Sequence, residues 1–172
     1  LNEIADELKA SYAIQTRVNM ETITADGQTL PSGGTLTAFD PPSGPGIRTD
    51  TYGYTGYTSN PSYDSLVAKL ITHSPSPDFE DAVRRTYRAL SEFRIEGVPT
   101  NLQFLQTLLQ HEDFTGLNFH TRFIEEKAAE LATTNGTVHP RLYAEATATV
   151  AVAADPGGYA GAQIDTSDPL AL

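Results

Sequence analysis

The 172-residue sequence contains no cysteine. This excludes disulfides and cysteine-based metal or redox sites, and it favours a reducing compartment, so we expect a cytoplasmic protein. No apolar run approaches the roughly 18 residues that a membrane-spanning helix needs, and no secretion signal is recognisable. The sequence also lacks an initiator methionine and opens in the middle of a pattern, so we expect a piece of a longer protein.

Basic residues are scarce. Eleven lysines and arginines stand against 22 aspartates and glutamates, giving a net charge of -11. Nucleic acids and anionic membranes attract basic surfaces, so we expect neither as a partner. Walker A, G-x-S-x-G and H-E-x-x-H motifs are absent. The four histidines are scattered singly, whereas a metal site needs three or four converging ligands, so we predict ordinary surface or hydrogen-bonded roles for His73, His111, His120 and His139.

The first half of the chain has the periodicity of β-strands. Residues 13–20 alternate apolar and polar, and residues 35–40 predict a short second strand. Residues 47–52 alternate again, which places Arg48 and Asp50 on the same side of a strand. Residues 65–71 are apolar on both faces, as in a covered central strand. The segments 24–34 and 41–46 are rich in turn-forming residues and predict irregular connections.

The second half has helical periodicity. We predict helices over 78–94, from about 100, and from about 121 to 131, with Asp78, Thr100 and Thr121 as N-caps and Gln103 completing a capping box. After about 133 the chain is rich in Ala, Thr and Gly and predicts a linker, with a lone strand at 148–154. The expected fold is α+β: a small antiparallel β unit packed with about three helices, over residues 1–132, followed by an irregular tail over 133–172.

Three features are candidate functional residues. Arg48 is either a strand arginine paired with Asp50 or a guanidinium that holds an anion near a cleft. The tyrosines of residues 44–71 either cover the sheet or form a sugar-binding platform. Glu96 is either a solvated carboxylate at the exit of the first helix, where the helix dipole is unfavourable, or a functional acid. Composition and periodicity alone leave these alternatives open.

Five ordered blocks carry a resemblance to a known family: AIQTRVN, PSGGTLTAFDPPSGPGIRTD, GYTGYTSNPSYDSLVAKLI, ALSEFRIEGVPTN and FHTRFIEE. Residues 13–131 resemble the C-terminal domain of biotin carboxylase, the ATP-grasp component of acyl-CoA, pyruvate and urea carboxylases. The combination of GIR, YDSLVAKLI and GVPTN is specific to this domain. The tail IDTSDPLAL is similar to linkers of single-chain acyl-CoA carboxylases.

The resemblance implies a ligase reaction in two stages. With magnesium, ATP phosphorylates bicarbonate, and the CO₂ released from the carboxyphosphate is captured by N1 of biotin on a carrier domain. A fixed cation stabilises the negative charge that develops on the ureido oxygen, and the residue in this position of the family motif is Arg48. Some members touch biotin with an acid before the G-[IV]-x-T-N block, and here that residue is Glu96.

The resemblance also implies components that this sequence does not contain. The nucleotide, metal and bicarbonate residues of the ATP-grasp domain belong upstream, so we expect no cofactor in this fragment and no turnover by it alone. The implied partners are that ATP-grasp domain, a biotin carboxyl carrier domain, a carboxyltransferase and, in a homodimer, a second copy. The loop at 21–34 departs from the commonest family pattern. Two alternatives are a non-catalytic docking scaffold and an extracellular sugar-binding module built on the tyrosines.

Overall fold

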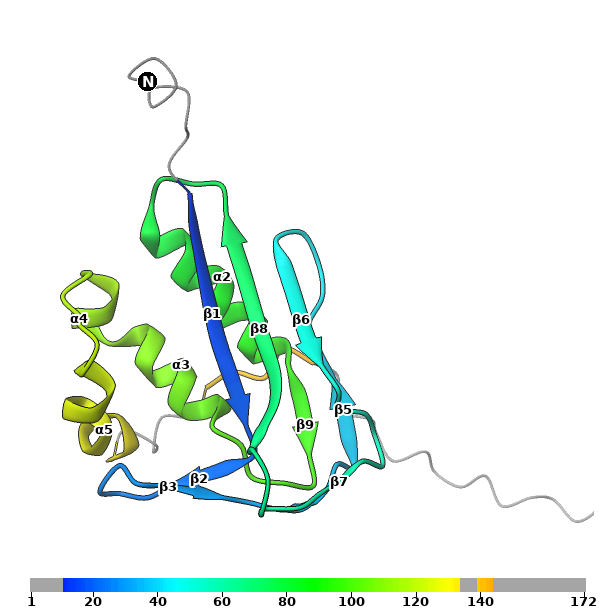
Figure 1. Cartoon of the computed structure of the whole chain (residues 1–172). Helices are drawn as coiled ribbons and strands as arrows, with labels where there is room; N and C mark the ends of the chain where they lie inside the picture. The colour runs from blue at the N-terminus through cyan, green and yellow to red at the C-terminus, as the bar shows by residue number, and fades with distance from the viewer. Residues whose placement is uncertain (1–10, 134–138, 144–172) are drawn as a thin grey trace, which may run out of the picture.

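The computed structural model describes residues 11–133 and 139–143. Its centre is a three-stranded antiparallel sheet in the order β1-β8-β6, formed by β1 (Tyr12–Asn19), β8 (Leu66–Ser74) and β6 (Ile47–Thr51) (Figure 1). The strands predicted at 13–20 and 47–52 are confirmed, although β1 ends at Asn19 and β6 at Thr51. The strand predicted at 65–71 is central, since β8 pairs with a strand on each side, but the predicted cover on both faces is wrong, because the face that carries Lys69 stays open.

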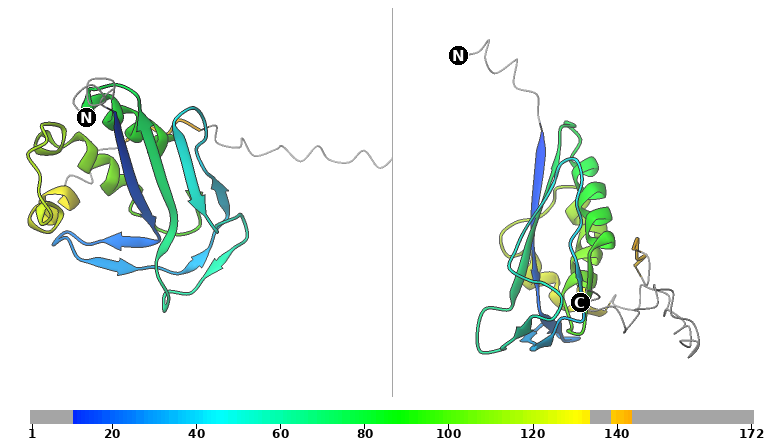
Figure 2. Two further views of the ribbon diagram at one scale, coloured as in Figure 1. Left: turned by 45° about the horizontal axis from the view of Figure 1, so that its top comes forward. Right: turned by 90° about the vertical axis from the view of Figure 1, so that its right-hand side faces the viewer.

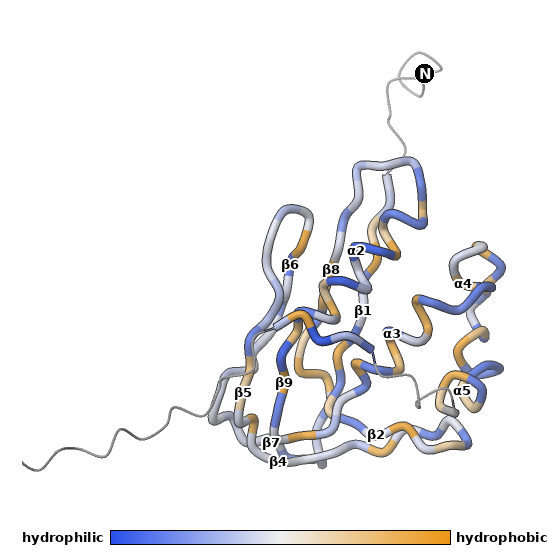
Figure 3. Tube along the Cα trace, turned by 180° about the vertical axis from the view of Figure 1, so that it is seen from behind, coloured by the Kyte–Doolittle hydropathy of each residue, from blue (hydrophilic) through white to orange (hydrophobic). Residues whose placement is uncertain are grey.

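Helices pack on one face of this sheet. Helix α2 (Phe79–Glu92) contacts β8 and β1, and α3 (Leu102–Gln110) packs beside α2 (Figure 2). Hydrophobic and hydrophilic residues alternate along both helices at helical spacing (Figure 3). The buried side of α2 meets β8 residues such as Val67 and Leu70 in the main core, and each such buried aliphatic side chain contributes about 1.5–3 kcal/mol.

The helix boundaries differ in part from the predicted ones. The Asp78 N-cap is confirmed, because its side chain accepts a hydrogen bond from the Glu80 N–H at 3.0 Å. The N-cap of α3 is Asn101 and not Thr100. Helix α5 (Phe123–Thr133) begins where His120 accepts hydrogen bonds from the Arg122 and Phe123 N–H groups. The short helix α4 (Glu112–Thr115), absent from the prediction, brings the described helices to four.

Three two-stranded ribbons extend the sheet region. They pair β2 (Glu21–Ile23) with β3 (Thr29–Pro31), β4 (Gly34–Thr35) with β7 (Thr58–Ser59), and β5 (Ala38–Asp40) with β9 (Arg94–Glu96). The loop predicted at 24–34 is therefore largely a hairpin. The single strand predicted at 35–40 is wrong, because the chain changes partner between Leu36, whose N–H bonds to Tyr57, and Thr37, whose N–H bonds to Glu96.

After α5 the described chain resumes at 139–143 beside α2, where the Leu142 N–H donates to the Ser91 carbonyl at 2.8 Å. The strand predicted at 148–154 lies outside the described residues. Among the described helices, none combines the length and apolar character needed to cross a bilayer. The α+β class with small antiparallel sheets is confirmed.

Candidate functional site

Arg48 is placed by a glycine that lets two strands approach closely. The connection before β6 ends in Gly46, whose φ is 74°. A Cβ at Gly46 would lie 2.5 Å from the His73 carbonyl oxygen, which real contacts do not allow. The Gly46 carbonyl instead accepts from the His73 N–H at 2.7 Å. This contact fixes the register that sets Arg48 opposite Ile71 on the central strand.

Strand alternation turns Arg48 away from the core. Its neighbour Ile47 packs against the main core, so Arg48 projects from the opposite face. Directly paired residues share a face, so Asp50 lies there opposite Lys69, which is in turn paired with Arg17 of β1. Three cations therefore share this open face of the sheet, although the chain as a whole is strongly acidic.

The pairing of Arg48 with Asp50 that the sequence predicted is present. Arg48 Nε lies 3.2 Å from Asp50 Oδ1, and Nη2 donates to Oδ2 at 3.2 Å. The two side chains are 70% and 51% exposed, and a pair this exposed contributes about 0–1 kcal/mol to stability. The fold therefore does not depend on the pair, and the guanidinium faces solvent, where an anion can reach it.

The tyrosines after Arg48 continue from the same strand. The Tyr52 hydroxyl donates to the Leu66 carbonyl at 2.6 Å, and burial raises the pKa of that phenol. Tyr57 makes edge-to-face contacts with Tyr52 and Tyr54 at centroid distances of 5.3 and 5.7 Å. An open cleft of about 460 Å³ adjoins them, lined by Met20, Tyr52, Tyr57, Thr58, Ser59, Asn60, Tyr63, Asp64 and Leu66. Tyr63 is 77% exposed at its rim.

Glu96 lies on a strand and not at a helix end. Helix α2 stops at Glu92, because Phe93 takes an extended conformation, and β9 then pairs Glu96 with Ala38. Arg94 Nε donates to Glu96 Oε1 at 2.8 Å, and this hydrogen bond is the largest cause that lowers the pKa of Glu96. The sequence analysis did not predict Arg94 as the partner of Glu96. Residues two positions apart on a strand share a face, so this spacing could have indicated the pair.

Arg48 and Glu96 belong to different sheets, and each has its own ion-pair partner. They share one property. Ile95, like Ile47, packs against the main core, so Glu96 and Arg48 both project from outward-facing positions next to a core residue. The structure thus supplies an exposed guanidinium and a half-exposed, ionised carboxylate on separate strands.

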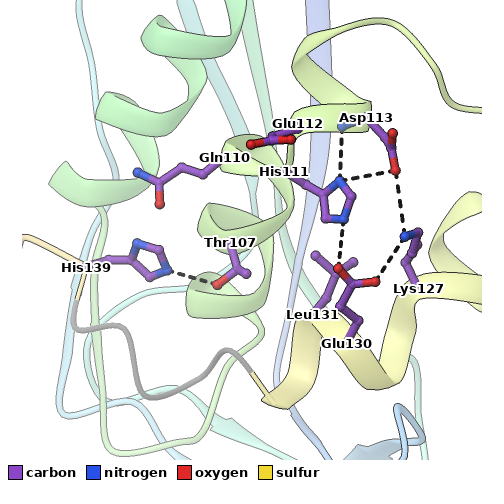
Figure 4. A pocket seen from close by; sticks show the side chains of 9 residues that line it. All are labelled: Thr107, Gln110, His111, Glu112, Asp113, Lys127, Glu130, Leu131 and His139. Carbon is purple, nitrogen blue, oxygen red and sulfur yellow. Dashed lines mark hydrogen bonds and ion pairs between the residues drawn. The ribbon is translucent and has the colours of Figure 1, made fainter.

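His111 has hydrogen-bond and ion-pair partners on α4 and α5. Figure 4 shows His111 between Asp113 and Glu130, with Nε2 3.3 Å from Glu130 Oε1, while Lys127 contacts both carboxylates. These side chains line a cavity of about 540 Å³ between α3, α4, α5 and the segment at 139–143. Within residues 11–133 and 139–143, no three His, Asp or Glu side chains are grouped so that they could hold a metal ion.

Comparison with known sequences identifies relatives of this chain. The family model of the biotin carboxylase C-terminal domain matches residues 15–126. Biotin carboxylase 1 of Bacillus subtilis is 42% identical over 114 residues, which cover 66% of this chain and 24% of that protein. The alpha3 subunit of the biotin-dependent acyl-coenzyme A carboxylase of Mycobacterium leprae is 37% identical over 129 residues, which cover 73% of this chain and 21% of that subunit. This chain spans about a quarter of the length of such curated relatives.

The solved structures that this chain resembles are also biotin-dependent carboxylases or their domains. A single-chain, multi-domain long-chain acyl-CoA carboxylase is 51% identical with a TM-score of 0.68, covering 71% of this chain and 13% of that one. A second structure is the biotin carboxylase domain dimer of Hydrogenobacter thermophilus 2-oxoglutarate carboxylase in complex with MgADP, ADP and bicarbonate. It is 36% identical with a TM-score of 0.64, and the match covers 71% of this chain and 26% of that one.

Proposed function

Because the chain belongs to the family of biotin carboxylase C-terminal domains, we propose that it contributes the Arg48 side of the site at which a biotin-dependent carboxylase of the acyl-CoA type carboxylates carrier-bound biotin. The observation that carries this proposal is the exposed guanidinium of Arg48 on the uncovered face of the sheet. The sugar-binding interpretation is set aside, because the family match accounts for the tyrosine segment as part of this domain.

Arg48 has the chemistry that the reaction needs. Carboxylation at a ureido nitrogen moves negative charge onto the ureido oxygen, and a preorganised cation there stabilises the transition state more than the ground state. A guanidinium stays charged at any physiological pH and offers a planar fork of donors. Asp50 holds that fork at 3.2 Å without burying it, so an incoming oxygen competes only with an exposed ion pair.

Glu96 is the second biotin contact in this proposal. Arg94 favours its ionised form, so it would accept a hydrogen bond from a ureido N–H and would not donate a proton. ATP, magnesium and bicarbonate would bind the ATP-grasp domain upstream. The remaining partners are the biotin carrier domain, the carboxyltransferase and, as in the Hydrogenobacter thermophilus domain dimer, a second copy. This assembly would act in the cytoplasm.

The test is Arg48→Ala in the complete carboxylase, with Asp50→Ala as the matched control. Both substitutions remove the same surface ion pair, but only the first removes the guanidinium. We expect Arg48→Ala to slow biotin carboxylation by about 10²–10³-fold, the usual cost of losing one oxyanion donor, with the KM for ATP unchanged. Asp50→Ala should retain carboxylation within about tenfold, since it keeps the cation.

Near-normal carboxylation by Arg48→Ala would instead support the alternative in which this domain is a docking scaffold. A parallel loss of ATP affinity would also count against the proposal, because it would mean that the substitution disturbs the assembly and not the biotin site alone.

A further inference from the structure

Residues 139–143 lie beyond the part of the chain that the family model matches, which ends at 126, yet they return to the domain. They pass beside the end of α2 and close to β9 (Figure 1). We propose that these five residues, which we call the clasp, position Glu96 by holding Arg94, and so link the chain that follows the domain to the biotin site. This inference rests on the proposed role of Glu96.

His139 anchors the clasp at its first residue. The ring is 6% exposed, and its two nitrogens lie 3.0 Å from the Tyr87 and Thr107 hydroxyls (Figure 4 shows the Thr107 contact). Thr107 donates its proton to the Gln103 carbonyl, so its oxygen accepts from His139 Nε2–H, and Tyr87 donates to Nδ1. A neutral imidazole satisfies both contacts. Burial lowers the pKa of His139 and favours that form.

The middle of the clasp completes the end of α2. The last carbonyls of a helix have no partner within the helix. The Leu142 N–H supplies one by donating to the Ser91 carbonyl at 2.8 Å, while the Leu142 side chain is 54% exposed. The backbone of the clasp is therefore bonded to the helix.

The last residue of the clasp reaches Arg94. The Arg94 guanidinium lies over the Tyr143 ring, 5.9 Å from its centroid, within the range of a cation–π contact. The edge of the same guanidinium faces two carboxylates, Glu96 at 2.8 Å and Asp40 at 3.5 Å. With its side chain only 20% exposed, Arg94 is held both at its edge and at its face.

A second clasp residue acts on Glu96. The positive charge of Arg141 adds to that of Arg94 in lowering the pKa of Glu96. Arg141 thus acts on Glu96 through its charge, and Tyr143 contacts the arginine that is bonded to Glu96. Without Tyr143, Arg94 would lose the contact on its flat face and would be freer to turn from Glu96 toward Asp40.

The experiment measures carboxylation of free d-biotin by the complete carboxylase carrying Tyr143→Ala, with Leu142→Ala as the matched control. We expect Tyr143→Ala to raise the KM for d-biotin about fivefold, the factor that the loss of one cation–π contact of about 1 kcal/mol corresponds to. The kcat and the KM for ATP should stay within twofold of the unsubstituted enzyme. Tyr143→Phe, which keeps the ring, should restore the KM, and Leu142→Ala should not change it.

A double-mutant cycle with Glu96→Gln shows whether Tyr143 acts through Glu96. If it does, Tyr143→Ala should have no further effect in the Glu96→Gln background. An unchanged biotin KM in Tyr143→Ala, or a full effect that persists in Glu96→Gln, would overturn the inference. If Glu96→Gln alone has no effect, the inference also falls, but Arg48→Ala still decides the proposed function independently. His139→Ala, which removes the anchor, should reproduce the effect of Tyr143→Ala.

Discussion

Asn101 Oδ1 accepts a hydrogen bond from the Asn19 backbone N–H at 2.9 Å, joining residues that are 82 positions apart in the sequence. Its Nδ2 donates to the Arg17 carbonyl at 3.1 Å and to Glu21 Oε1 at 3.2 Å. Asn101 thus ties the start of α3 to the end of β1 and satisfies one oxygen of a carboxylate that is 7% exposed. The other oxygen of Glu21 accepts from Asn19 Nδ2 and Ser65 Oγ.

We predict that Asn101→Ala destabilises the chain by about 2–4 kcal/mol, because it leaves the partly buried Asn19 N–H and a buried carboxylate oxygen of Glu21 without partners. Urea unfolding measures this. The control is Gln103→Ala, at the exposed position that the sequence wrongly assigned to a capping box, and it should change the free energy of unfolding by less than about 0.5 kcal/mol. Equal effects of the two substitutions would contradict this account of Asn101.

The error over Asn101 shows where sequence patterns stop being informative. Thr100 and Gln103 have the spacing of a capping box, and a local motif cannot reveal that the next residue is recruited by a strand 82 positions away. Period-two alternation, by contrast, is a local property that burial on one face enforces, and it placed Arg48 and Asp50 on the same side of β6 correctly. The two-residue strands were missed because two residues carry no periodicity.

The contacts of the candidate site also fall into those that sequence spacing predicts and those that it does not. The pairing of Arg48 with Asp50 follows from alternation within one strand. The contacts of Glu96 involve Arg94 on the same strand, Asp40 of another strand through Arg94, and Arg141 of the chain after α5. Only the first of these lies close enough in the sequence to be inferred from spacing. The remainder depends on tertiary packing, which composition and periodicity do not specify.

Asp81 should make the stability of the chain depend on pH. Hydrogen bonds from Ser74 and Arg85 lower its pKa from 3.8 to about 2. A carboxyl whose pKa is lower in the folded state stabilises the fold above its unfolded pKa, and this contribution is lost as the pH falls from about 4 to about 2. We therefore expect Asp81→Asn to lower the free energy of unfolding at pH 7. The difference in free energy of unfolding between this variant and the unsubstituted chain should shrink toward pH 2. Urea titrations at pH 7, 4 and 2.5 measure this, and a difference independent of pH would refute it.

Gly97 and Gly56 provide a matched pair for backbone strain. Both have positive φ, 93° and 94°. A Cβ at Gly97 would lie 2.1 Å from the Thr35 carbonyl oxygen, whereas a Cβ at Gly56 would meet nothing within 4 Å. Gly56→Ala should therefore lower the free energy of unfolding only by the strain of a positive φ, about 1–2 kcal/mol. Gly97→Ala should cost at least about 2 kcal/mol more, because the end of β4 at Thr35 or the backbone after β9 must shift. Thermal unfolding compares them, and similar melting temperatures would show that the contact relaxes easily.

The buried hydroxyls of Thr72 and Thr86 form a hydrogen bond with a defined direction. Both side chains are fully buried. Thr86 Oγ1 donates to the Ala82 carbonyl at 2.7 Å, so its proton is used, and Thr72 must donate to Thr86. Replacing Thr86 by Val leaves the Thr72 proton buried without an acceptor, whereas replacing Thr72 by Val leaves Thr86 still bonded to the helix.

We expect Thr86→Val to cost about 1–3 kcal/mol and Thr72→Val less, since an unmet buried donor is penalised more than a lost acceptor contact. The double substitution should cost less than the sum of the two, because removing both partners removes the unmet group. Urea unfolding of the four proteins in this cycle gives the coupling energy. If Thr72→Val proves the more costly substitution, the proton between these threonines runs in the opposite direction.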